Sequence, residues 1–342
     1  MEIGSEFWES GDTGRKKYLL SGRTALEYII RDILREHKVD SVLMPSYCCH
    51  TMIEPFVKHG IRVRFYDVFY DAQQGLCVDI PEPYKNEIFY LMSYFGFSKI
   101  SGISFTEIQD SYQVILEDET HSWLQNGKRS IADYTYASCR KWTGFYGIAE
   151  AVKRSGAFTI GTGNTGEAYS CMRQEAMQMK RKYIEKQFSD KQQFLARYAE
   201  AEQYLEENYV DYEPTLECMV QYLNTDWDFI KEQRRKNAKI LIQGIKNISG
   251  RIQIYKDIEE TDTPLFVPVL IEKDRDKFRK YMIDQQVYCP VHWPLSKYHE
   301  GLSERGKKLY KKELSLVCDQ RYGERDMERI VHLVEQYFKE GV

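Results

Sequence analysis

Two residues in the first half of the chain have types and positions that could support chemistry on a cofactor or substrate. Asp118 stands where the apolar run Gln113–Glu117 stops, and open α/β sheets bind ligands outside the carboxyl ends of such strands. A carboxylate there could pair with a cationic ring nitrogen, although a solvated acidic turn explains the same residues. Lys141 follows Ser138 by three positions, and burial beside Arg140 would lower its amine pKa enough for attack on an aldehyde. The alternative is an ordinary surface Arg-Lys pair.

The segment Ser21–Leu26 combines small residues with the start of a helix. The free N–H groups and positive dipole end of this helix could receive a phosphate, aided by the hydroxyl of Thr24. Ser and Gly before a helix also make an ordinary cap. A phosphate site, a carboxylate and a lysine in this chain order are the main anchors that pyridoxal phosphate (PLP) needs. Their order therefore favours a PLP site more than any one of them does alone.

The segments that position these residues alternate between short β-rich runs and helical periods. This pattern predicts an α/β fold with a mostly parallel central sheet flanked by helices. A helix is expected from Thr24 to about Glu36, because its apolar residues keep helical spacing. The predicted strands are Ser41–Pro45, Arg62–Asp67, Glu87–Tyr94, Gln113–Glu117 and Asp133–Ser138.

A smaller α+β unit is predicted in the C-terminal part of the chain. Long charged helices are expected over about Glu167–Glu207, and Glu213-Pro214 marks a turn. The later elements are a helix at Asp226–Lys246, strands at Arg251–Tyr255 and Leu265–Ile271, and helices at Asp274–Gln286 and Glu324–Lys339. We therefore expect a large cofactor-binding domain at 1–210 and a small domain at 211–342.

The composition argues against several classes of protein. The 48 basic and 52 acidic residues give a formal net charge of −4 with neither sign in a long block, so we expect no nucleic-acid partner. The start Met1–Ser10 has no signal-peptide pattern, and no stretch approaches the roughly 18 apolar residues of a membrane span. The 8 cysteines lack a C-x-x-C pair and the 7 histidines lack metal spacing. We expect a cytoplasmic protein with reduced, mostly buried thiols and no metal site.

Segments through most of the chain resemble the DegT/DnrJ/EryC1/StrS aminotransferases, fold-type-I PLP enzymes that act mainly on nucleotide-linked keto-sugars. The resemblance lies in SGRTALEYI, SVLMPSYCCHTMIEP, LMSYFG, VILEDETHSW and YASCRKW, and then in RRKNAKIL, PVHWPL and LSLVCDQRYGERDMERIV. It implies the aspartate-aminotransferase fold, with a large PLP-binding domain and a smaller C-terminal α+β domain.

The resemblance also implies roles for the residues at matching positions. Lys141 would carry the cofactor as a Schiff base, and Asp118 would bind its pyridinium nitrogen. Gly22, Arg23 and Thr24 would cradle the phosphate through backbone and hydroxyl groups.

Five further positions receive roles in the same way. His121 would lie near the phenolic oxygen of the cofactor ring, and Ser138 would contact the phosphate. His292 and Trp293 would lie near the substrate mouth, although a Pro-bounded turn with a packed Trp explains them equally well. Since fold-type-I sites usually form at dimer interfaces, we expect a homodimer whose partner contributes contacts, with Asn164 as a candidate.

The sequence departs from the family pattern at three places. The serine stands three residues before the lysine, as in the wider fold-type-I class, where the family commonly has five. The position of the family's aromatic residue that stacks on the cofactor ring falls at Cys49, so stacking would pass to a neighbour such as Tyr47 or His50, or would be weak. The glycine-rich stretch after the lysine reads GFYGIAEAV. These differences bear on the sugar substrate more than on the cofactor.

The favoured function is transfer of an amino group from an amino-acid donor to a keto substrate. A PLP-dependent lyase or dehydratase would use the same anchors, and a degenerate binding or regulatory protein would keep only the fold. Cys48-Cys49-His50 is a poor nucleophile–base pair, because adjacent residues of an extended segment point to opposite faces.

Overall fold

The computed structural model of the protein describes residues 14–98, 100–127, 130–187, 190–246, 248 and 250–340. The start Met1–Ser10, which carried our expectation about a signal peptide, lies outside the described residues. Within them, no helix combines the length and apolar character that crossing a membrane requires.

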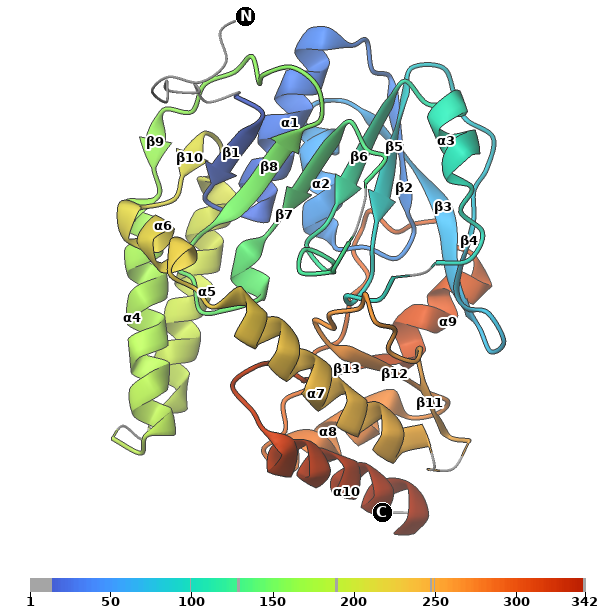
Figure 1. The fold of residues 1–342 in the computed structure, drawn as a ribbon, viewed down its shortest axis with the longest axis vertical. Helices are drawn as coiled ribbons and strands as arrows, with labels where there is room; N and C mark the ends of the chain where they lie inside the picture. Colours follow the sequence, from blue (N-terminus) through green and yellow to red (C-terminus); the bar gives the residue numbers. More distant parts are fainter. Residues whose placement is uncertain are drawn as a thin grey trace, which may run out of the picture.

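An eight-stranded sheet forms the core of the larger part of the molecule (Figure 1). Its order is β1-β8-β7-β6-β5-β2-β3-β4, and the five strands from β7 to β3 run parallel. The antiparallel pairs lie toward the edges, where β8 joins β1 to β7 and β4 follows β3. The strands are β1 (Lys16–Leu19), β2 (Ser41–Pro45), β3 (Arg62–Asp71), β4 (Gly75–Asp79), β5 (Glu87–Met92), β6 (Val114–Asp118), β7 (Tyr134–Ala137) and β8 (Ala149–Lys153).

The central strands β2, β5 and β6 are buried along their whole length. This burial explains their continuous apolar sequences, because helices cover both faces of a parallel sheet. The covering helices include α1 (Gly22–Glu36), α2 (His50–Lys58) and α3 (Phe105–Ser111). Helix α1 contacts β7 and β8 and packs against α2. Its first turn is capped by Ser21, whose side chain accepts a hydrogen bond from the N–H of Thr24.

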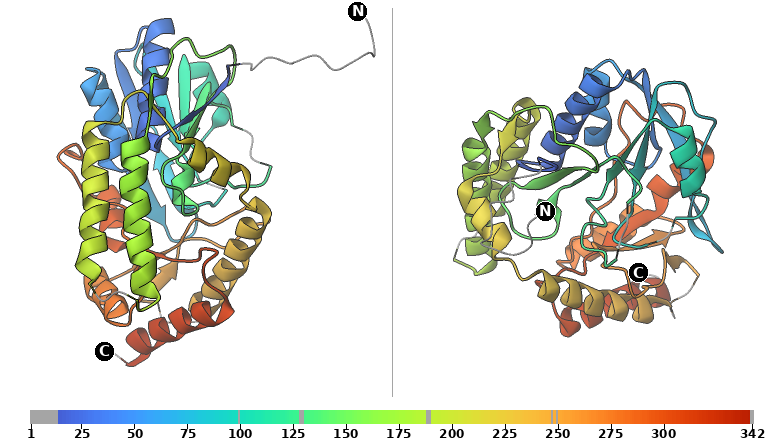
Figure 2. Two further views of the ribbon diagram at one scale, coloured as in Figure 1. Left: turned by 90° about the vertical axis from the view of Figure 1, so that its left-hand side faces the viewer. Right: turned by 45° about the horizontal axis from the view of Figure 1, so that its top comes forward.

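A helical hairpin stands beside the sheet (Figure 2). It consists of α4 (Glu167–Ile184) and α5 (Lys191–Glu207), which pack along each other. The short strands β9 (Asn164–Thr165) and β10 (Tyr212–Glu213) pair at its base, and α6 (Leu216–Leu223) follows.

The C-terminal part is built on a three-stranded antiparallel sheet of β11 (Ile252–Ile254), β12 (Val267–Ile271) and β13 (Glu313–Leu316). The helices around it are α7 (Trp227–Lys246), α8 (Arg275–Asp284), α9 (Glu304–Lys312) and α10 (Glu324–Glu340). Helix α7 packs against α10, β11 and β12, while α9 contacts both β12 and β3 of the large sheet. The mixed α/β architecture is as predicted, and the boundary at 210/211 stays a prediction.

Candidate active site

The predicted anchors lie at the carboxyl ends of neighbouring strands. Asp118 is the last residue of β6, and the 3-10 turn η1 (Cys139–Lys141) follows β7 directly. Hydrogen bonds from these segments meet at Thr120: the N–H of Ser138 donates to its Oγ1 over 3.1 Å, and the indole of Trp142 donates to its carbonyl over 2.8 Å. The lysine turn is therefore tied to the loop that follows Asp118.

Asp118 is a buried carboxylate whose donors are neutral. Its Oδ1 accepts the N–H of Thr120 at 2.8 Å, and its Oδ2 lies 2.8 Å from the hydroxyl of Tyr136 and 3.2 Å from that of Tyr90. Burial raises the pKa of Asp118, although these hydrogen bonds oppose the shift. A cationic ligand group would stabilise the ionised carboxylate, so the site fits a protonated ring nitrogen.

The side chain of Lys141 is exposed, but neighbouring protein groups still alter the pKa of its ammonium. Desolvation and the adjacent charge of Arg140 lower the pKa of its ammonium. Arg140 is held in place by Glu202 of α5, with 2.8 Å between Nη1 and Oε1. Burial alone would raise the pKa of Glu202, but Arg140 outweighs it and brings the value to about 2. The lowered pKa increases the fraction of neutral amine at Lys141, which is the nucleophilic form.

The turn before α1 lies against the segment before η1. A Cβ built on Gly22 would stand 3.0 Å from the Cβ of Ser138, so a larger residue would push these two segments apart. The Arg23 side chain is also buried, and its guanidinium lies beside Glu206 and the ring of Tyr209. Nη1 has no hydrogen-bond partner among the described residues, while Nη2 lies 3.9 Å from Glu206. The hydroxyl of Thr24 lies 2.9 Å from that of Ser21. This donor set at a helix N-terminus suits a phosphate.

His121 is held as a neutral imidazole close to Lys141. Its Nδ1 accepts the N–H of Phe95 over 3.2 Å, which places the ring proton on Nε2. Burial holds the pKa of His121 well below its usual range, and the charges of His292 and Lys141 add to the shift. With this tautomer, Nε2–H could donate to the phenolic oxygen near which His121 was predicted to lie.

His292 and Trp293, which were predicted to lie near the substrate mouth, lie beside His121. The Trp293 ring stacks on His121 at 5.6 Å between centroids, and His292 lies 5.6 Å from it. The Nδ1 of His292 is 2.9 Å from the hydroxyl of Ser315. Trp293 also lies 5.3 Å from the ring of Tyr47.

Tyr47 does not present a face for cofactor stacking. Its side chain has no exposed surface, because it packs between Tyr94, Trp293 and Tyr310. Of the stacking candidates, Cys49 and His50 remain accessible.

Cys49 has an extended backbone but His50 begins a helix, so our reason for rejecting this pair, that the two side chains point to opposite faces, was wrong. Cys49 caps α2 and His50 is its first residue, which brings Sγ and Nδ1 to 3.9 Å. Burial alone would raise the pKa of Cys49, but hydrogen bonds with His50 and Thr51 outweigh it and lower the pKa. The charge of Cys49 also acts on Lys141, so the thiol belongs to the same cluster.

Asn164 is not part of this cluster within one chain. It is an exposed residue of β9, pairs with Tyr212 of β10, and donates its N–H to the carbonyl of Asp211. A role in the site would therefore require a second subunit.

Tyr90, Tyr136 and Glu202 are site residues that the sequence analysis missed. Tyr136 stands directly opposite Asp118 in the β6–β7 register, so correct strand pairing would have found it. Its position five residues before Lys141 is where the resembled family commonly has serine. No local signal links Glu202 of α5 to Arg140, because the contact crosses 62 residues of sequence.

A separate apolar pocket of about 290 Å³ opens on the other side of β6. Its lining includes Leu91, Phe97, Ile103 and Glu117, and none of the predicted site residues. Adjacent strand residues point to opposite faces, so Glu117 faces away from Asp118. Among the described residues, no three His, Cys, Asp or Glu side chains gather as a metal site would require.

Comparison with known proteins gives a structural match without a sequence match. No family model matches the sequence, and no curated protein matches it. Spr1654 of Streptococcus pneumoniae, described as a sugar aminotransferase and solved in its PLP form, has 14% identity and a TM-score of 0.64, with 96% of this chain and 88% of that one covered. A DegT DnrJ EryC1 StrS aminotransferase of Brucella abortus has 12% identity and a TM-score of 0.60, covering 95% and 87%. DesI in the presence of its TDP-sugar product has 13% identity and a TM-score of 0.65, covering 95% and 81%.

The chain has the fold of these aminotransferases. The predicted fold class, a large domain with a mostly parallel sheet and a smaller α+β part, is confirmed by these matches and by the sheet order. At 12–15% identity the matches establish architecture, and the chemistry has to be argued from the residues.

Proposed function

We propose that the protein is a PLP-dependent aminotransferase. The observation that carries the proposal is the convergence of three separate segments on one place. The loop after Asp118, the turn of Lys141 and the start of α1 are joined through Thr120, Ser138 and the close approach at Gly22. These are the carboxylate, amine and phosphate-binding elements that PLP requires.

Each residue would have a defined task toward the cofactor. Bound PLP supplies an aldehyde for the amine and a ring that withdraws electrons. Asp118 would hold the protonated ring nitrogen, and the amine of Lys141 would bond to the aldehyde and later move a proton. The Nε2–H of His121 would donate to the ring oxygen.

The phosphate would be held at the start of α1. Gly22 and Arg23 offer N–H groups in the first turn, where a helix leaves its donors unpaired. The hydroxyls of Thr24 and Ser138 border the same place, and the buried Nη1 of Arg23 supplies a donor that lacks a protein partner.

We propose a nucleotide-linked keto-sugar as the amino acceptor and an amino acid as the donor. The support is the similarity in fold to DesI, together with the half-buried rings of His292 and Trp293 beside His121. A planar ring pair suits stacking on a sugar face or a base. A panel of amino donors and keto acceptors, analysed by mass spectrometry, tests this assignment and detects lyase or dehydratase products.

We propose that the protein acts as a homodimer. The support is an apolar stripe on α6, where Leu216 and Leu223 are 81% and 70% exposed and Val220 lies between them. Helix α6 follows β10, which pairs with the strand that contains Asn164. Sedimentation of the wild type and of Leu216→Glu with Leu223→Glu tests the interface: a wild-type dimer that the double variant dissociates supports it, and a wild-type monomer refutes it.

A cytoplasmic location is also proposed. Its support is the state of the cysteines, which are free thiols at all eight positions, most of them buried. Cell fractionation with a tagged chain tests it.

The cofactor assignment is tested by the visible absorption spectrum with added PLP. We expect a band that borohydride fixes covalently to the chain in the wild type and in Lys180→Ala, but not in Lys141→Ala. Lys180 is a matched control, since burial and neighbouring cations also lower its pKa. A wild type without a Lys141-dependent band would overturn the enzyme assignment and favour a binding or regulatory protein.

A further inference from the structure

Trp142, the residue after Lys141, is the point where the lysine turn is anchored. Its N–H donates to the carbonyl of Cys139 at 3.0 Å, closing the 3-10 turn. Its indole N–H donates to the carbonyl of Thr120, two residues beyond Asp118. The ring is almost fully buried, so Trp142 has little freedom to move independently of either segment.

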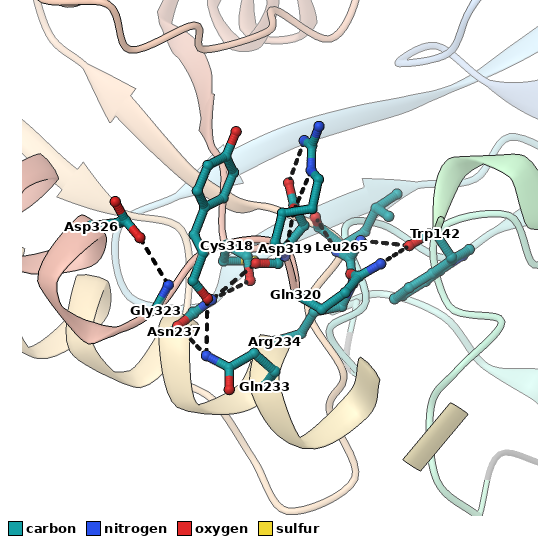
Figure 3. Close-up of polar contacts among 12 residues, drawn as sticks. Trp142, Gln233, Arg234, Asn237, Leu265, Cys318, Asp319, Gln320, Gly323 and Asp326 are labelled. Carbon is teal, nitrogen blue, oxygen red and sulfur yellow. Dashed lines mark hydrogen bonds and ion pairs between the residues drawn. The ribbon is translucent and has the colours of Figure 1, made fainter. Parts of the chain in front are cut away.

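Two side chains from the C-terminal part converge on the carbonyl of Trp142 (Figure 3). Nη2 of Arg234, on α7, donates to it over 3.0 Å, and Nε2 of Gln320, after β13, donates to it over 2.9 Å. The two side chains are joined to each other, because Nε of Arg234 donates to Oε1 of Gln320 over 2.9 Å. The guanidinium also lies 4.9 Å from the centre of the Trp142 ring.

Arg234 is buried among neutral acceptors. Its Nη1 donates to the carbonyl of Leu265 over 3.0 Å, next to β12, and approaches that of Pro264. Desolvation lowers the pKa of this guanidinium, so its burial has an electrostatic cost. A planar group with several diverging N–H donors can join three segments in this way, whereas a lysine ammonium in the same place would reach fewer of them.

The loop that carries Gln320 is itself fixed by α7. Nδ2 of Asn237 donates to the carbonyls of Cys318, Asp319 and Tyr322 at 3.2, 3.0 and 3.0 Å, as Figure 3 shows in part. Nε2 of Gln233 adds a hydrogen bond to Tyr322. The sequence segments RRKNAKIL and CDQRYG, which had no assigned role, therefore form one unit that donates two hydrogen bonds to the carbonyl of Trp142.

We propose that Arg234 and Gln320 are positioning residues for Lys141, acting through the carbonyl of Trp142. Their hydrogen bonds to the carbonyl of Trp142 fix the lysine turn against the C-terminal part, which fixes the position of the Lys141 amine relative to Asp118. This inference rests on the proposed role of Lys141. A misplacement of about 1 Å at a reacting group can cost on the order of 100-fold in rate, which is why such an anchor matters.

The experiment compares Arg234→Lys with Arg235→Lys as a matched control. Arg235 is the next residue of α7 and donates to the carbonyls of Glu259 and Asp262, without a contact to Trp142. The first readout uses protein without added cofactor: the pH dependence of Lys141 acetylation by acetic anhydride, measured by peptide mass spectrometry. The second is the Kd for PLP, and the melting temperature reports folding.

For Arg234→Lys we expect an altered pH profile of Lys141 acetylation and a Kd for PLP raised about tenfold, as for a displaced binding group. Arg235→Lys should match the wild type in both. Gln320→Leu removes one of the two donors to Trp142 and should change both readouts in the same direction. If Arg234→Lys does not fold, Gln320→Leu is the variant that tests the inference.

One outcome would overturn the positioning role of Arg234 and Gln320, and a different outcome would overturn the proposed function of Lys141. A folded Arg234→Lys and a folded Gln320→Leu that both match Arg235→Lys in acetylation profile and Kd would show that the anchor does not position Lys141. A wild type that binds no PLP through Lys141 would instead remove the proposed function, while the acetylation profile would still report whether the anchor places this amine.

Discussion

The hydroxyls of Tyr90 and Tyr136 lie 2.5 Å apart, and that of Tyr136 is 2.8 Å from Oδ2 of Asp118. A third contact, from Tyr90 to the same Oδ2, measures 3.2 Å. Two phenols have only two protons for these three contacts, and the shortest one requires a proton between the phenols. Since 2.8 Å is the shorter contact with the carboxylate, the distances favour a chain in which Tyr90 donates to Tyr136 and Tyr136 donates to Asp118.

Replacing Tyr136 with Phe should weaken both the fold and the hold on the cofactor. A hydrogen bond to a buried carboxylate contributes about 1.5–3 kcal/mol, so we expect a loss of about 2 kcal/mol in the free energy of urea unfolding. The pKa of Asp118 should rise further, because one donor to its ionised form is lost, and PLP should bind more weakly.

Tyr66→Phe is the control for this variant. The Tyr66 hydroxyl is equally buried, but it donates to the carbonyl of Tyr90 over 3.2 Å rather than to a carboxylate. It should lose about 1 kcal/mol and leave the Kd for PLP unchanged. Equal Kd values in Tyr136→Phe and Tyr66→Phe would contradict the assigned chain.

Substitutions at Arg140 and Glu202 should move the pKa of Lys141 in opposite directions. The charge of Arg140 lowers this pKa and that of Glu202 raises it. Arg140→Met should therefore reduce the fraction of neutral amine at a given pH, and Glu202→Gln should increase it. Titration of Lys141 by NMR after ¹³C reductive methylation would measure both, and shifts of the same sign would refute the electrostatic account.

The ion pair of Asp32 and Lys153 should make stability depend on pH in the acid range. Asp32 has no exposed surface and accepts Nζ of Lys153 at 2.7 Å and the N–H of Thr159 at 2.8 Å. Burial raises the pKa of Asp32, but these hydrogen bonds outweigh it and lower the pKa. Asp32 is therefore protonated at a lower pH in the folded chain than in the unfolded chain, where an Asp side chain has a pKa of about 3.9. The contribution is present above that pH and is lost as pH falls through the folded pKa.

Asp32→Asn tests this pair, since removing one member of a buried ion pair costs about 3–5 kcal/mol. Urea unfolding at pH 7 should show that loss, and the difference from wild type should shrink at pH 3. Glu36→Gln is the comparison, because Glu36 also contacts Lys153 but its side chain is 35% exposed, so a smaller loss is expected. An undiminished difference at pH 3 would count against the linkage.

Cys49 should react with iodoacetamide faster than its burial implies, and PLP should protect it. The lowered pKa of Cys49 raises the thiolate fraction near neutral pH, and the thiolate is the nucleophile. Cys171 is exposed and serves as the internal reference. Peptide mass spectrometry with and without PLP should show protection at Cys49 alone, and equal labelling in both samples would place the cofactor elsewhere.

The strands that the sequence predicts well are those that the fold buries on both faces. Ser41–Pro45 has the predicted bounds, and Gln113–Glu117 is shifted by one residue, because continuous apolar runs identify such strands. β1 and β8 were missed, since KKYL and AEAVK are short and become strands only by pairing with each other and with β7. The local sequence patterns of β1 and β8 do not predict this pairing.

The same division applies to the candidate site. Asp118 and Lys141 were predicted because each follows an apolar strand-like run, whereas Tyr90 and Arg234 were not predicted. Tyr90 is a buried aromatic residue like many others, and its hydroxyl acquires a role only through contacts across 28 and 46 residues. Arg234 reads as part of a charged helix until β12 and Trp142 are placed against it.

The pairing of β1 with β8 has a consequence for how the chain folds as it is synthesised. Lys16 is the register partner of Val152, so β1 leaves the ribosome long before its partner exists. The turn at Ser21–Thr24 follows β1 and packs against Ser138, which is also synthesised much later than β1. A nascent chain that ends before Ala149 would hold the parallel strands β2 to β7 without this closing edge. Strand β1 is thus made before β2 to β7 but can be paired only after them.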